Sequence, residues 1–186
     1  NNAFVHRGFS FESALLDGMM LLKEKDASTV LVGAIDEITL ISHTILSRMG
    51  LYKNGPVSNL DIFKSASKGT IAGEGSAFFL VSDEPSQTDY AKLDGLKTFY
   101  KPDSKNEIDK QIISFLTAHS VSLNEIDLVI SGKCGDTNLD KIFDQLTDDI
   151  FNNTCVVNYK DLCGEYPTAS AFALWLGANI VKTGSI

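Results

Sequence analysis

Apolar residues recur along the chain at two different spacings, and these spacings predict helices and strands in alternation. Between Phe11 and Leu22 the spacing is three or four residues, which predicts an amphipathic helix with Ser10 as its N-cap. The run "TVLVGAID", residues 29–36, is continuously apolar, as is typical of a strand buried on both faces. We expect a second helix in "ISHTILSRMG" and a second buried strand in "AFFLVSD". This order indicates a layered α/β sheet.

The second half of the chain continues the alternation. The expected strands are "KLDGLKTFY", "IDLVIS" and "TCVVNY", and the expected helices are 107–119, 139–146 and 168–182. Pro167 is placed at the first turn of the last helix and Glu165 near its positive N-terminal end. The βαβα order again favours an α/β fold.

Composition and charge exclude several classes of protein. The 186 residues are 44% hydrophobic, enough for a sizeable core, yet no apolar run has the roughly 18 to 20 residues of a membrane span. The formal net charge of -8 argues against a nucleic-acid partner. Cys134, Cys155 and Cys163 form no CxxC pair, which argues against a zinc cage or a disulfide framework. We therefore expect a cytoplasmic protein, and because the chain begins with Asn1 instead of Met, a fragment of a longer one.

The glycine-rich loops do not have the spacing of nucleotide-binding motifs. Gly132-Lys133 lacks the preceding glycine and the following hydroxyl residue of a phosphate loop. His43 and His119 lie in helical patterns, where roles at a helix surface or at a helix C-terminus are expected. In Gly73-Glu74-Gly75, two glycines around one acid suggest close backbone approach and a carboxylate that accepts from neighbouring amides.

The chain contains, in order, the segments "LVGAIDE", "FKSASKGTIAGEGSAFFLVSD", "IDLVISGKCGDTNLDKIFDQL" and "NYKDLCGEYPTASAFALWLGANIVKTG". Together these segments resemble the β-ketoacyl synthase family of fatty-acid and polyketide synthesis. In "LVGAIDE", Gly33 and Ala34 stand at the family's two glycines and Asp36 at its acid. "FKSASKGTIAGEGSAFFLVSD" is similar to the family's segment that runs from a Phe through Asp-Gly to Gly-Glu-Gly and a strand. Gly73, Glu74 and Gly75 match this motif in type, whereas Lys68 stands where the Asp before Gly69 would be.

The two remaining segments cover the family's catalytic histidines, and both histidines are absent. "IDLVISGKCGDTNLDKIFDQL" resembles the His-Gly-Thr-Gly-Thr loop through Gly135 and Asp140, with Gly132 at the position of the first histidine. "NYKDLCGEYPTASAFALWLGANIVKTG" resembles the segment with the family's Lys and Gly-His through Lys160 and Gly164. Glu165 stands at the position of the second histidine.

The family's nucleophilic cysteine is also absent. Its position, one helix before the Gly-Gly strand, falls near Gly8, with His6 and the weak nucleophile candidate Ser10 close by. A glycine provides neither a nucleophile nor a hydrogen-bond donor, and an ionised Glu165 would repel a developing oxyanion. The family's reaction is therefore expected to fail in this chain.

The resemblance implies a thiolase-like fold, a layered αβαβα sandwich with mixed five-stranded-type sheets, here incomplete at the N-terminal side. Residues 1–61 would form the later part of the N-terminal half and residues 62–186 the C-terminal half. It implies no cofactor and no metal. It also implies an acyl carrier protein as partner and a dimer, either with a second copy or with an active ketosynthase.

Three interpretations of function remain open at this point. The first is a non-catalytic partner subunit of an active ketosynthase, similar to a chain-length factor. The second is an active 3-oxoacyl-carrier-protein synthase, an acyltransferase, with substituted catalytic residues. The third is a stand-alone protein that binds an acyl group or an acyl carrier.

Overall fold

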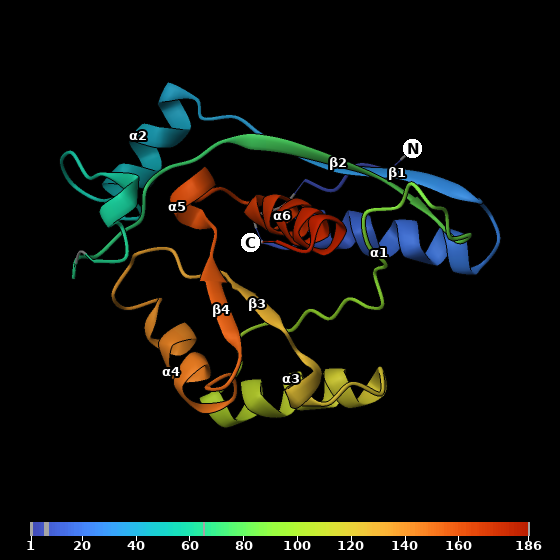
Figure 1. Ribbon diagram of the computed structural model, residues 1–186. Coiled ribbons are helices and arrows are strands. Elements are labelled where there is room, and N and C mark those ends of the chain that lie inside the picture. The colour runs from blue at the N-terminus through green and yellow to red at the C-terminus, as the bar shows by residue number, and fades with distance from the viewer. Residues whose placement is uncertain (1, 6–7, 65, 186) are drawn as a thin grey trace. The chain divides into compact units, whose positions relative to one another are not determined.

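The computed structural model describes residues 2–5, 8–64 and 66–185, and it divides into two compact units. The first unit comprises Asn1–Ile38, Gly73–Leu96 and Glu165–Ile186, and the second comprises 39–72 and 97–164. Figure 1 labels the elements of both. The predicted boundary between residues 61 and 62 concerns the two halves of a fold, a different kind of division from these units, so it stays a prediction.

The first unit is an antiparallel strand pair with two helices on one face. Strand β1 (Thr29–Asp36) pairs with β2 (Gly75–Ser82) along its whole length, with Thr29 opposite Ser82 and Asp36 opposite Gly75. Helices α1 (Ser10–Lys23) and α6 (Ala169–Thr183) lie on the same side of this pair (Figure 1). The buried core lies between α1, β1 and α6 and consists of Phe11, Leu15, Val32, Ala34 and Ala171.

Only one face of the β1–β2 pair is buried, which corrects the prediction of strands buried on both faces. Successive side chains of a strand point to opposite faces, so Val32 and Ala34 face the helices. The outward face of β1 and β2 carries Leu31, Ile35, Phe78 and Leu80, which are 67%, 69%, 55% and 74% exposed. The apolar run does form a strand, as predicted, but its second face has no cover among the described residues.

The second unit contains a parallel strand pair. Strand β3 (Leu128–Ser131) pairs with β4 (Cys155–Asn158), and helix α4 (Lys141–Asp149) connects them as a parallel crossover requires. The other elements of this unit are α2 (Leu40–Arg48), η1 (Asn59–Asp61), α3 (Lys105–Ala118), η2 (Leu123–Glu125) and α5 (Lys160–Cys163). The predicted βαβ order is therefore confirmed.

The predicted strand at 92–100 is wrong. These residues form no strand and pair with no described strand, although Leu93 and Leu96 pack against the core of the first unit. Lys97 instead donates from Nζ to Ser114 Oγ of α3 at 2.7 Å. Alternating apolar residues make a strand only where a partner accepts the backbone hydrogen bonds, and none does here.

Two helix starts also differ from expectation. Ser10 is the first residue of α1 and not its N-cap, which is Phe9. Helix α6 begins at Ala169 with Thr168 as N-cap, so Pro167 precedes the helix and does not lie in its first turn. Shifts of one or two residues at helix ends are common, because the apolar spacing identifies the buried face of a helix and not the residue at which the helix begins.

In the part of the chain that the structure describes, no helix combines the length and the apolar character that crossing a membrane would require.

Candidate functional site

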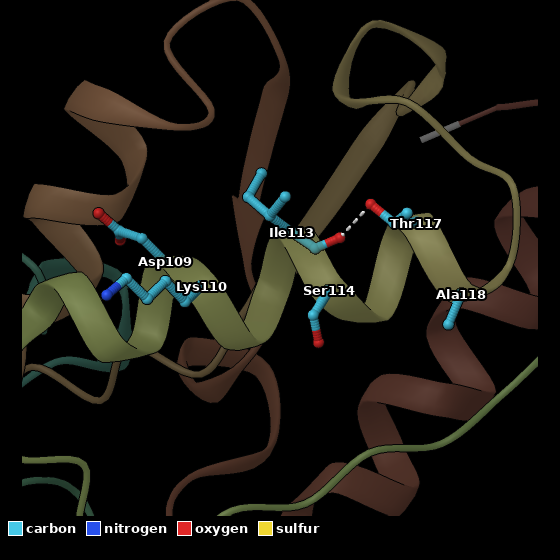
Figure 2. Close-up of a pocket in the computed structure, with 6 residues that line it drawn as sticks. All are labelled: Asp109, Lys110, Ile113, Ser114, Thr117 and Ala118. Carbon is cyan, nitrogen blue, oxygen red and sulfur yellow. Dashed lines mark hydrogen bonds between the residues drawn. The ribbon is translucent and has the colours of Figure 1, made fainter.

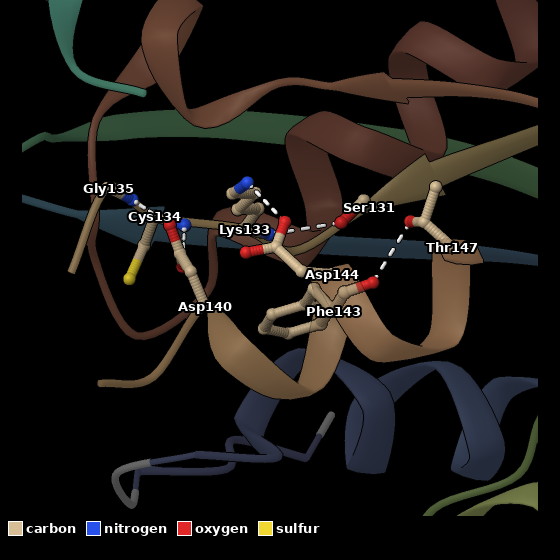
Figure 3. A network of polar contacts seen from close by, with 8 residues as sticks. All are labelled: Ser131, Lys133, Cys134, Gly135, Asp140, Phe143, Asp144 and Thr147. Carbon is tan, nitrogen blue, oxygen red and sulfur yellow. Dashed lines mark hydrogen bonds and ion pairs between the residues drawn. The ribbon is translucent and has the colours of Figure 1, made fainter. Parts of the chain in front are cut away.

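The carboxylate of Asp140 forms hydrogen bonds within its own loop, residues 132–140, which follows β3 (Figure 3). One carboxylate oxygen accepts from the Cys134 N–H at 2.8 Å and the other from the Gly135 N–H at 2.7 Å. Asp140 is buried. A buried carboxylate needs such donors, so Asp140 fixes the path of this loop.

A second buried carboxylate, Asp136, ties the same loop to residues 66–70. It accepts from the backbone N–H groups of Gly69, Asn138 and Leu139, the last two at 2.8 and 3.2 Å. The Gly69 bond, with the other two amides and the charge of Lys53, outweighs burial and lowers the pKa of Asp136 below its ordinary value. Asp136 is therefore an ionised structural group with its oxygens engaged by amides.

Lys53 strengthens this connection from a third segment. Its Nζ donates to Ser67 Oγ at 2.7 Å and to the Gly135 carbonyl at 2.8 Å. Gly135 has a φ of 85°, and a Cβ there would lie 2.3 Å from Cγ1 of the fully buried Ile62. Both the conformation and the lack of space require glycine.

Gly132, which the resemblance predicts at the position of a catalytic histidine, has room for a Cβ atom. The φ of Gly132 is not positive, and a Cβ there would lie 3.4 Å from Cζ of Phe143, which is an ordinary van der Waals contact. The neighbouring Lys133 forms an ion pair with Asp144 on α4 (Figure 3). The Lys133 ammonium group is thus paired with a carboxylate of the protein.

Lys160 and Gly164 mark the two ends of α5. Lys160 is half-buried, and its Nζ lies 5.8 Å from the centre of the Tyr159 ring. Gly164 is the C-cap with a φ of 75°, and its N–H donates to the Lys160 carbonyl at 2.9 Å. The sequence does not predict this four-residue helix, because it is too short to show an apolar period.

In the first unit, Glu165 lies beside the Gly73-Glu74-Gly75 motif. The Glu165 carbonyl accepts from the Gly73 N–H at 3.0 Å. Glu74 Oε2 accepts from the Ile38 N–H at 2.9 Å, and a Cβ at Gly75 would lie 2.8 Å from Tyr166 Oη. The expected carboxylate–amide bond and the expected close backbone approach are both present.

The acid that contacts the start of α6 is Asp36, which sequence reasoning had not linked to this helix. Asp36 Oδ2 accepts from the N–H and from Oγ1 of the N-cap Thr168, at 2.9 and 2.6 Å. A carboxylate at this end is favoured by the orphan amides and by the helix dipole. Glu165 lies four residues before the helix begins, so the role predicted for it belongs to Asp36.

Gly8 and Ser10 flank the turn into α1. Gly8 is exposed, with a φ of 89° and open space around the position of a Cβ. Ser10 is buried, and its N–H donates to the Gly8 carbonyl at 2.7 Å. Their neighbour in the sequence, His6, lies outside the described residues. The left-handed backbone at Gly8 disfavours any side chain, a nucleophilic one included.

The two described histidines have structural roles. His43 stacks on Tyr52 with ring centres 5.2 Å apart. His119 is the C-cap of α3, and its Nδ1 lies 2.8 Å from the Phe115 carbonyl. Within residues 2–5, 8–64 and 66–185, no three His, Cys, Asp or Glu side chains gather as metal ligands would.

A pocket on the surface of α3 lies outside these segments (Figure 2). Its lining residues are Asp109, Lys110, Ile113, Ser114, Thr117 and Ala118. Asp109 pairs with Lys105 at 2.7 Å, and Thr117 Oγ1 donates to the Ile113 carbonyl at 2.8 Å. None of the predicted site residues lines this pocket.

The predicted site positions are thus divided between the units: Gly8 and Glu165 belong to the first, and Gly132 and Lys160 to the second. Within the units, the structure places Glu165 beside Gly73, and Gly135 beside Asp140. These positions offer two glycines, a lysine and a carboxylate. Such a set supplies no thiol or hydroxyl nucleophile and no neutral imidazole donor.

Comparison with known proteins identifies the fold. No protein-family model and no curated protein matches the chain. Among solved structures, the chain is similar to one described as the ishigamide ketosynthase/chain length factor, with a TM-score of 0.63 and 18% sequence identity. The match covers 92% of this chain and 45% of that one, so the chain spans less than half the length of the structure it matches.

The chain therefore has the ketosynthase-type, thiolase-like α/β fold, as the sequence predicted. Its described strands form two separate two-stranded sheets, one antiparallel and one parallel. The assignments of individual site positions stay predictions, because the similarity concerns the fold alone.

Proposed function

We propose that this chain is a β-ketoacyl synthase-like protein of polyketide or fatty-acid biosynthesis that acts as a non-catalytic partner of an active ketosynthase. It would act in the cytoplasm and, with that partner, on acyl groups carried by an acyl carrier protein.

One observation carries the proposal: a chain with a ketosynthase-type fold has no cysteine before Cys134. The helix before the Gly-Gly-type strand is α1, which begins at Ser10 and follows Gly8. The position that the sequence predicts for the nucleophile is near Gly8, an exposed glycine with a φ of 89°. A thioester cannot form on a residue without a side chain.

The alternative is an active synthase with a substituted nucleophile, for which Ser10 is the candidate. Ser10 is buried in the first turn of α1, and burial limits the access of an acyl thioester to its hydroxyl. This burial favours the non-catalytic role.

The test is co-expression of this chain with a cysteine-bearing ketosynthase encoded beside it, followed by size-exclusion chromatography and by incubation with an acyl thioester. We expect a stable complex in which mass spectrometry finds the acyl group on the ketosynthase cysteine alone. The matched control uses the ketosynthase with that cysteine changed to alanine, which should still bind this chain and should leave the complex unlabelled.

Two other outcomes would overturn the proposal, each in a distinguishable way. An acyl group on Ser10, Cys134, Cys155 or Cys163 would indicate an active enzyme with substituted residues. A chain that neither binds the synthase nor becomes labelled would instead be a stand-alone binding protein, and its retention of an acyl carrier protein in the same chromatography would identify its ligand.

A further inference from the structure

We draw no further inference here: the strongest candidate, the outward apolar face of the β1–β2 pair formed by Leu31, Ile35, Phe78 and Leu80, carries nothing because nothing in the structure shows what covers it.

Discussion

Asp136 illustrates how a single ionised group fixes the path of a loop in this protein. Its carboxylate accepts from three backbone amides and lies near Lys53. We expect Asp136→Asn to lower the free energy of unfolding by about 1–3 kcal/mol, because a neutral amide is a weaker acceptor and offers an unpaired N–H. Urea unfolding at pH 7 measures this. Asp127→Asn, the same change at an exposed position, should stay within about 0.5 kcal/mol of the parent.

The pH dependence of that difference has a definite sign. The pKa of Asp136 is lowered in the folded state, so its stabilisation is present above the ordinary aspartate pKa and is lost as the pH falls through the lowered value. The difference between the parent and Asp136→Asn should hold steady from about pH 7 to pH 5 and shrink below about pH 4. A difference that is constant down to about pH 2 would show that the charge of Asp136 does not stabilise the fold.

Gly135 is required for space as well as for its backbone conformation, and the two causes can be separated. Gly135 and Gly55 share a φ of 85°, but a Cβ at Gly135 would meet Ile62 at 2.3 Å, whereas nothing lies within 4 Å at Gly55. Gly55→Ala should cost about 1–2 kcal/mol from conformation alone. Gly135→Ala should cost at least about 1–3 kcal/mol more, because the buried side chain must move. Equal losses in thermal or urea unfolding would contradict this packing.

At the scale of elements, the end of β1 holds the start of α6. Asp36 accepts from the N–H and the hydroxyl of Thr168. Asp36→Ala should lower the free energy of unfolding by about 1–3 kcal/mol, and Thr168→Val should remove the hydroxyl part of the same interaction. A double-mutant cycle should give a coupling of at least about 0.5 kcal/mol, whereas strictly additive losses would show that the two side chains do not interact.

A helix or strand could be predicted from the sequence where the residues that determine it lie within the element itself. The apolar periods of α1, α3 and α6 lie within the helices themselves, so their existence and approximate bounds followed from the sequence. The segment 92–100 has the composition of a strand, but whether it pairs depends on residues elsewhere in the chain. The four residues of α5 contain no period at all.

The same distinction applies to the candidate site. The adjacent glycines made a carboxylate–amide bond of Glu74 predictable, but not its partner, the N–H of Ile38, which lies 36 positions away. The bond from Thr168 to Asp36 joins residues 132 positions apart, and the bond from Gly69 to Asp136 and that from Lys53 to Gly135 are also long-range. No local sequence pattern indicates such partners. The contacts of Asp36, Asp136 and Lys53 therefore could not be predicted.

At the scale of the whole molecule, the exposed outward face of the β1–β2 pair should govern the behaviour of this chain in solution. Apolar patches of this kind promote association. We expect the 186-residue chain to self-associate as its concentration rises, and we expect Leu31→Thr with Leu80→Thr to reduce that association in sedimentation velocity. Leu162→Thr, which removes another exposed leucine, should have a smaller effect. A parent chain that stays monomeric and melts cooperatively at all concentrations would contradict this expectation.

The proposal that this chain has no catalytic nucleophile can be tested directly by measuring condensation. The measurement is product formation from acyl and malonyl groups on a carrier protein. The complex of this chain with the proposed partner ketosynthase is compared with the same complex in which the ketosynthase cysteine is alanine. We predict product from the first complex and none above background from the second or from this chain alone. Product from either of the latter two would show that this chain retains a catalytic nucleophile and would refute the proposed function.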